Sequence, residues 1–194
     1  MAGYHHGDPC RIGRRYDISG AYAPDMSAGG TLTADFTMDW REYYQLSSRT
    51  LLAARLFTGI SGGNFPNLYY FGGLNTLRGY DTYSIVGNRA AYANFEFRFP
   101  LIDVLAMPFL VLQQVRGNIF FDIGAASYNG TSLETGQKFT FVENGRLKDG
   151  LSSVGYGLSF NFLGLELHWD FAKRFDLKNT SGKARTSFWI GQTF

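Results

Sequence analysis

The chain has 194 residues, a formal net charge of +2 and an aromatic content of 17%, with 24 glycines but only five prolines. The small net charge and the lack of any run of Lys or Arg exclude a nucleic-acid partner, and the single cysteine, Cys10, excludes an intramolecular disulfide framework. Abundant aromatics and glycines with a mean hydropathy of -0.14 predict strands and tight turns in which apolar and polar residues alternate.

Residues 1–14 form an N-terminal segment without the apolar stretch of a secretory signal, so we expect no signal peptide in this sequence. No apolar stretch reaches the ~18–20 residues of a membrane-spanning helix. The best candidate, residues 101–112, is too short and contains Asp103 and Pro108. The His, Cys, Asp and Glu residues show no spacing typical of a metal site. We therefore expect neither a metal nor a cofactor.

Alternation with a period of two residues is the strongest pattern in the chain. In TLTADFTMDWR, residues 31–41, apolar side chains from Leu32 to Trp40 alternate with polar ones, which no amphipathic helix does over eleven residues. Together with its repeats, this pattern predicts eight strands in chain order: about 15–23, 31–41, 48–60, 89–99, 115–125, 151–162, 164–173 and 185–194. Several reach the ~9–11 residues that a tilted transmembrane strand needs.

The predicted connections alternate between short and long. Residues 45–46 and Leu163 mark tight turns, whereas 61–88, 127–150 and 174–184 are long and rich in Gly, Asn, Thr and Lys. Short turns at one end and long loops at the other are typical of a bacterial outer-membrane barrel. The apolar segment 100–114 is an exception, because it is a longer connection at the short-turn end.

The two faces of the predicted strands favour lipid outside the sheet. The polar face is more charged than the interior of a soluble sandwich, carrying Asp35, Asp39, Arg55, Glu96, Arg98, Asp122, Glu166 and Asp170. The apolar face is expected to carry aromatics near strand ends, as an interfacial girdle does: Tyr43, Tyr44, Phe99, Trp169 and Phe194. The alternative is a soluble sandwich or lipocalin-like barrel, in which the apolar face turns inward.

The longest loop contains the segment YFGGLNTLRGYD, residues 70–81, which has an Arg-Gly-Tyr motif at Arg78, Gly79 and Tyr80 preceded by Gly72 and Gly73. This motif resembles the hallmark of the BamA-like superfamily of outer-membrane assembly and translocation barrels, the bacterial surface antigen family. The resemblance implies that loop 61–88 folds back into the barrel.

The resemblance also implies that acidic residues on the next two strands hold Arg78. Glu96 in NFEFRFP and Asp122 in FFDIG stand in the matching contexts. Both fall on the polar face of strands that should be neighbours, and the donor fork of a guanidinium suits two acceptors. The chain end SFWIGQTF resembles the family's final strand, so Phe188, Gly191 and Phe194 are expected to form the C-terminal assembly signal and seam.

The predicted fold is thus an all-β, transmembrane antiparallel meander of about eight strands, forming one membrane domain over 1–194 without a periplasmic repeat domain. It resembles the C-terminal half of a sixteen-stranded barrel. The sequence leaves open whether eight strands close alone, pair with a second copy or are a fragment, and whether the loop enters the lumen.

The expected function is insertion, assembly or translocation of proteins at the bacterial outer membrane; a passive pore-like barrel is the alternative. The expected partners are the bilayer, unfolded client polypeptides and a second copy of the chain. An enzyme is not expected, because no serine stands in a nucleophile motif. Glu166, His168 and Asp170 are interpreted as lumen lining.

Overall fold

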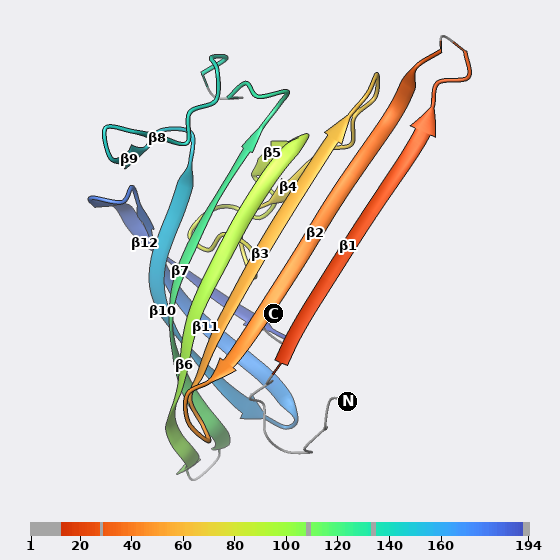
Figure 1. The fold of residues 1–194 in the computed structure, drawn as a ribbon. Helices are drawn as coiled ribbons and strands as arrows, with labels where there is room; N and C mark the ends of the chain where they lie inside the picture. The colour runs from red at the N-terminus through yellow and green to blue at the C-terminus, as the bar shows by residue number, and fades with distance from the viewer. Residues whose placement is uncertain (1–12, 28, 108–109, 133–134, 192–194) are drawn as a thin grey trace.

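The computed structural model describes residues 13–27, 29–107, 110–132 and 135–191. They form an eight-stranded antiparallel meander that is strongly twisted and curls into a trough (Figure 1). In sheet order the strands are β1 (Gly13–Pro24), β2 (Thr31–Gln45), β3 (Leu51–Gly62), β6 (Arg89–Met107), β7 (Leu110–Ser127), β10 (Leu151–Phe162), β11 (Leu165–Phe175) and β12 (Thr180–Ile190). All eight predicted strands are therefore confirmed.

Two short hairpins in the long loops were not predicted. β4 (Tyr69–Phe71) pairs with β5 (Ile85–Gly87) on the concave side of the sheet (Figure 1). β8 (Val142–Glu143) pairs with β9 (Arg146–Leu147) in the loop that follows β7. Elements of two or three residues are too short to show a period in the sequence.

Two predicted connections were wrong. Segment 100–114 is not an apolar connection, because β6 and β7 stay paired from Arg89↔Ser127 to Met107↔Leu110 and project as a long hairpin at the lower end of Figure 1. Segment 174–184 is not a long loop, because β11 and β12 are joined by residues 176–179. The Asp176 carboxylate accepts hydrogen bonds from the backbone N–H groups of Asn179 and Lys178, which lowers the pKa of Asp176 and closes a tight turn.

The sheet does not close on itself within the described residues. β1 pairs only with β2, and β12 pairs only with β11. Both edge strands are exposed along almost their whole length on both faces. The structure of this chain is therefore an open half-barrel, in which the outer side of each edge strand has no partner among the described residues.

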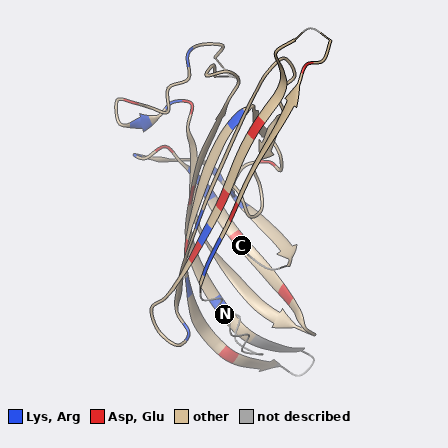
Figure 2. Ribbon diagram, turned by 45° about the vertical axis from the view of Figure 1, so that its right-hand side comes forward, with Lys and Arg blue, Asp and Glu red and all other residues tan. Residues whose placement is uncertain are grey.

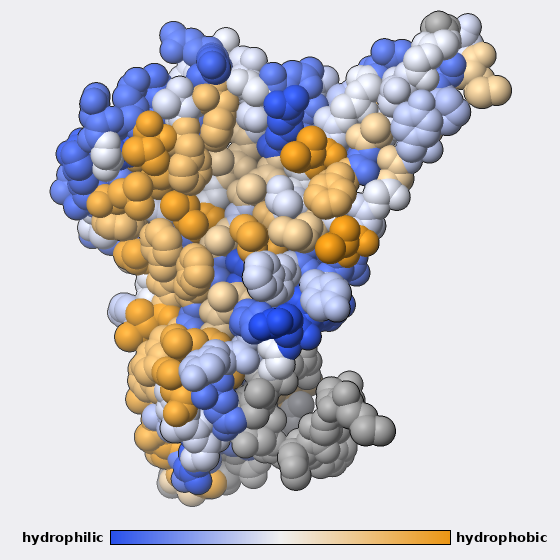
Figure 3. Space-filling model, viewed as in Figure 1, coloured by the Kyte–Doolittle hydropathy of each residue, from blue (hydrophilic) through white to orange (hydrophobic). Residues whose placement is uncertain are grey.

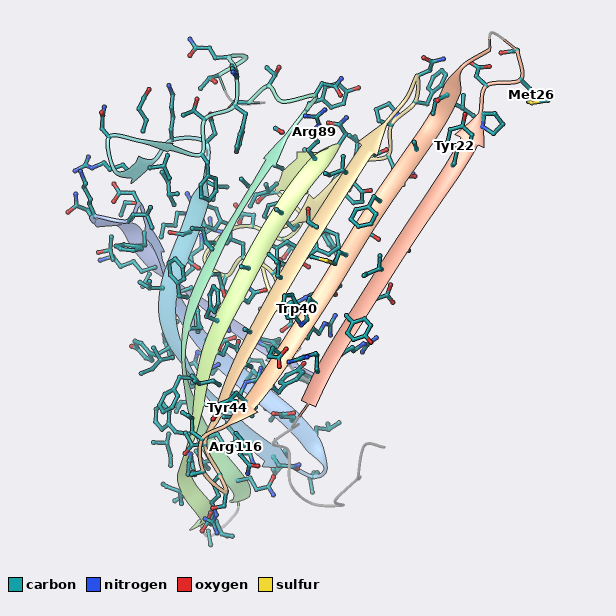
Figure 4. The ribbon with its side chains drawn as sticks, in the orientation of Figure 1. Tyr22, Met26, Trp40, Tyr44, Arg89 and Arg116 are labelled. Carbon is teal, nitrogen blue, oxygen red and sulfur yellow. The ribbon has the colours of Figure 1, made fainter. Side chains whose placement is uncertain are left out.

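Strand register assigns every side chain to one of two faces. The convex face is apolar across its middle, whereas the loops above it are hydrophilic (Figure 3). Its exposed apolar residues on successive strands include Phe36, Trp40, Tyr44, Leu52, Leu56, Ile60, Phe95, Ile119, Tyr156, Leu158, Trp169, Phe188 and Ile190. Trp40 and Tyr44 are labelled on β2 in Figure 4. No helix formed by the described residues is long and apolar enough to cross a membrane.

The concave face is polar, as predicted. Charged residues interrupt the strands at separated positions (Figure 2). Three that were predicted to lie on the polar face, Glu96, Asp122 and Asp170, are at most 2% exposed. The prediction that Tyr43 lies on the apolar face was wrong. This residue does not belong to an outer aromatic girdle, because it packs on the concave side with Leu51 and Ala53.

Candidate functional site

The loop between β3 and β6, residues 63–88, crosses the concave face; we call it the inner loop. It reverses direction at Gly72 and Gly73, which have φ angles of 114° and 79°, and a Cβ at Gly73 would lie 2.8 Å from Thr82 Oγ1. Only glycine adopts this conformation without strain at such a close approach. Leu77 then packs with Phe71 of β4 against the sheet, fully buried. These contacts place Arg78 over the floor of the trough.

Arg78 is 3% exposed and meets both predicted carboxylates. Its Nε and Nη2 atoms donate to the two carboxylate oxygens of Asp122, each at 2.7 Å, and its Nη1 donates to Glu96 Oε1 at 2.5 Å. Its backbone N–H donates to Asp122 as well, at 3.1 Å. The two contacts predicted from the sequence are therefore present, with bidentate geometry on Asp122. We call Arg78, Glu96 and Asp122 the latch.

Neighbouring side chains complete the latch. Asn94 donates to Asp122 Oδ1 at 2.9 Å, and Arg98 donates to the second oxygen of Glu96 at 2.7 Å. The Arg78 guanidinium lies 3.5 Å from the ring centroid of Phe120, which forms the floor beneath it. Desolvation opposes the charge of Arg78, but the nearby carboxylates of Asp122 and Glu96 outweigh it, so the pKa of Arg78 is raised.

The rest of the Arg-Gly-Tyr motif ties the inner loop to the C-terminal strands. Gly79 has a φ of 84°, a Cβ there would lie 3.3 Å from Ala172, and its carbonyl accepts from Arg174 Nε at 3.2 Å. The Tyr80 hydroxyl donates to the Ser152 carbonyl at 3.2 Å, and the Arg174 guanidinium lies 4.4 Å from the Tyr80 ring centroid. The inner loop therefore rests on β10 and β11.

One ion pair extends this attachment to the edge strand β12. The Asp81 carboxylate accepts from both terminal nitrogens of Arg185, and this interaction lowers the pKa of Asp81. On the other side of the trough, Arg55 of β3 donates to the Asn75 carbonyl at 3.0 Å. Among the described residues, β1 forms no hydrogen bond with the inner loop. Asn67 of the inner loop donates to Asp35 of β2 at 2.5 Å, so side-chain contacts attach the inner loop to strands from β2 to β12 but, within the described part of the chain, not to β1.

Comparisons with known proteins identify the family of this chain. A family model for the Omp85 superfamily domain matches residues 14–194. The chain belongs to the Omp85 superfamily. A search of curated proteins finds no match. Among solved structures, the chain is similar to BamA from Haemophilus ducreyi lacking POTRA domains 1–3, with a TM-score of 0.65 and 17% sequence identity. The alignment covers 98% of this chain and 40% of that one, so the chain spans less than half the length of this relative.

The structure of this Omp85-superfamily chain also contains a polar cluster that the sequence did not predict. Trp189 of β12 donates its indole N–H to Asp170 Oδ2 at 2.9 Å and stacks on His168 with ring centroids 4.0 Å apart. His168 Nε2 lies 2.9 Å from the Gly191 carbonyl. The cluster holds the end of β12 against β11. His168 and Asp170 are lumen-lining, as interpreted from the sequence, but they also fix this edge strand.

The predicted C-terminal residues lie apart from the latch. Phe188 is 59% exposed on the convex face of β12, and Gly191 follows the end of that strand. Phe194 lies outside the described residues, so its expected place in the assembly signal stays a prediction. No group of three or more His, Cys, Asp or Glu residues within the described part of the Omp85 domain could hold a metal ion.

Proposed function

We propose that this chain takes part in inserting or translocating polypeptides at the outer membrane, without covalent chemistry, and that β1 is the strand that receives a client. Membership of the Omp85 superfamily and similarity to BamA support the general class. The observation that carries the proposal is the unequal attachment of the two edges. Each edge strand has side-chain contacts with its neighbour, but β12 is also held to the inner loop by Asp81–Arg185, whereas β1 is attached only to β2.

The free edge of a strand is a template on which another strand can pair. Unpaired backbone N–H and C=O groups are costly in lipid, so an open edge there gains from pairing with an incoming segment. The β1–β2 pairing is regular from Gly13↔Tyr43 to Ala23↔Thr33, and Arg14 donates to Glu42 across it. β1 is therefore an ordered, extended strand with one free side.

A pair of proline variants tests this role. Consecutive residues of a strand direct their N–H groups to opposite sides, so of Ile18 and Ser19 one donates toward β2 and the other toward the free edge. We expect one of Ile18→Pro and Ser19→Pro to destabilise the sheet. The other should fold normally yet slow client insertion at least about fivefold, because proline removes an edge donor.

The measurement is the rate at which an unfolded outer-membrane barrel, diluted from urea, folds into vesicles that contain this protein. Unchanged insertion by the variant that still folds would exclude β1 as the template. Ion conductance without any acceleration of insertion would instead support the passive pore-like barrel.

A second copy of the chain is a further proposed partner for the same edges. β1 and β12 run in opposite directions, as any first and last strands of an eight-stranded meander must. β12 of one copy can therefore pair antiparallel with β1 of another, and two such junctions would close a sixteen-stranded barrel around a two-fold axis. Register parity then places Ser19 and Ser187, both on the concave face, on the same side of the junction.

In detergent we expect a protein mass of twice the 21.7 kDa of one chain. With Cys10 replaced by Ser, Ser19→Cys combined in turn with Arg185→Cys, Ser187→Cys or Trp189→Cys should form an intermolecular disulfide at the position that lies opposite Ser19, since same-face neighbours across strands approach within bonding distance. Ser19→Cys with Phe188→Cys is the matched control, because these side chains lie on opposite faces. A single-chain mass without crosslinking would contradict this pairing.

A further inference from the structure

We propose that the convex face carries a binding site for one anionic phospholipid, with the acyl chain in a groove along β6 and the phosphate on Arg89. This inference goes beyond the proposed function and does not depend on it. It rests on the shape of the groove, on the ordered cap over its upper end and on the surroundings of Arg89.

The groove follows from a change of side-chain size along β6. The residues of its convex face are Arg89, Ala91, Ala93, Phe95 and Phe97, so two methyl groups are followed by two phenyl rings. Leu56, Thr58 and Ile60 of β3 form one wall beside the alanines, and on β7 Ile123 flanks Ala93, whereas small Ala125 lies beside Ala91 and widens the groove. The resulting groove has a volume of about 380 Å³ and is lined on this face by Leu56, Thr58, Ile60, Ala91, Ala93, Ile123, Ala125 and Ser127. That volume lies within the roughly 300–1,000 Å³ typical of ligand sites.

The upper end of the groove is capped by the loop that follows β7. Phe139 and Phe141 line it, with ring centroids 6.5 Å apart. Phe139 is fixed by its backbone N–H, which donates to the Gly130 carbonyl at 2.9 Å, and the Phe141 carbonyl accepts from the Lys148 backbone N–H at 3.1 Å. The cap is thus built by ordered backbone contacts and does not require a ligand to form.

Arg89 stands at the upper mouth of the groove, at the start of β6 (Figure 4). Its side chain is exposed and forms no hydrogen bond or ion pair with any described residue. Most other arginines of the described chain have carboxylate or carbonyl partners, as Arg78 and Arg185 do. A guanidinium that ends an apolar groove at the level where strands give way to loops is positioned for a headgroup phosphate, which it binds through a planar fork.

The positive charge of Arg89 determines which class of lipid the groove binds. Apolar surfaces gain little from meeting each other within a bilayer, since lipid tails are as apolar as the groove. The groove alone therefore accepts the chain of any lipid. Arg89, which has no hydrogen-bond or ion-pair partner among the residues that the structure describes, adds selectivity for a negative charge at the headgroup level, so the occupant is an anionic phospholipid and not a zwitterionic one.

The test uses the whole chain refolded into vesicles that contain equal amounts of phosphatidylglycerol and phosphatidylcholine, then extracted for native mass spectrometry. We expect the wild type to retain phosphatidylglycerol over phosphatidylcholine by about fivefold. Arg89→Gln should remove this preference while lipid of both kinds is still retained. Ala91→Phe fills the groove and should reduce retention of both lipids.

Lys183→Gln is the matched control, because Lys183 is an exposed cation on another strand, β12, and does not line this groove. It should leave the preference unchanged. The proposal would be overturned if Arg89→Gln and Lys183→Gln lost the preference for phosphatidylglycerol equally. It would also be overturned if Arg89→Gln kept the full preference. Inorganic phosphate added to the vesicles should not displace the bound lipid. If phosphate displaced the lipid to the same extent in the wild type and in Ala91→Phe, Arg89 would belong to a site for free phosphate, and the proposal would be overturned. Melting temperatures of all variants confirm that each is folded.

Discussion

Replacing Arg78 with Ala is expected to lower the free energy of unfolding by about 3–5 kcal/mol, because the buried Asp122 loses the guanidinium that neutralises it, while Glu96 keeps Arg98 as a charged partner. Asp122 and Glu96 are at most 2% exposed, so water cannot solvate them in place of the guanidinium. Urea unfolding in detergent, followed by tryptophan fluorescence, measures the change. Arg78→Lys should recover only part of it, since an ammonium cannot make the paired bonds to Asp122.

A double-mutant cycle separates the latch from general loop damage. Asp122→Asn alone should destabilise the protein by a similar amount, and Arg78→Ala with Asp122→Asn should cost less than the sum of the single changes. Arg146→Ala is the control, because this arginine is exposed and its ion pair with Asp176 is 3.8 Å long. It should change stability by less than about 0.5 kcal/mol. Strict additivity of the latch changes would show that Arg78 and Asp122 act independently.

The sequence predicted the strands well because alternation is a local property. Each strand of a barrel has one face toward lipid and one toward the lumen, so the period is visible without knowledge of neighbouring strands. The same parity placed Glu96 and Asp122 on one face, and the strand pair Asn94↔Asp122 brings them together. The Arg78 contacts could be predicted because the motif and both acceptors were present, even though the path of the inner loop was not visible.

Adjacent aromatic residues explain the wrong prediction for Tyr43 and the position of Phe120, for which no prediction was made. In Tyr43-Tyr44 and Phe120-Phe121 one ring of each pair must face the lumen, whatever the average character of the strand. The structure turns Tyr43 and Phe120 inward, and Phe120 becomes the surface on which Arg78 rests. An aromatic on an otherwise polar face was the available signal, and it marks the places where the lumen is packed.

Closure of the sheet could not be predicted, because it depends on what lies beside β1 and β12. An edge strand has the same alternation whether its free side meets lipid, a client strand or another chain. Likewise the Trp189–Asp170 bond joins residues whose strands are aligned by a bulge between Ala172 and Arg174. Such register shifts leave no clear trace in a single sequence.

The assignment of the two faces predicts a second large effect at Phe95. This residue lies on the convex face of β6, is 50% exposed and occupies the middle of the paired region between β3 and β7. If that face contacts the hydrocarbon core, Phe95→Lys should cost about 2–4 kcal/mol of unfolding free energy, because a charge near the bilayer midplane is poorly solvated. Refolding titrations into vesicles measure the change.

Two controls isolate charge burial in lipid from the other consequences of the Phe95 substitution. Phe95→Leu removes the ring but keeps an apolar side chain, so it should cost much less than Phe95→Lys. Thr37→Lys introduces the same charge on the concave face of β2, beside Asp39 and Asp35, and should be tolerated because that face is polar. Equal destabilisation by Phe95→Lys and Thr37→Lys, or a larger effect of the latter, would show that the convex face does not meet lipid. If the sheet were a soluble structure with its apolar side inward, Thr37→Lys would face solvent.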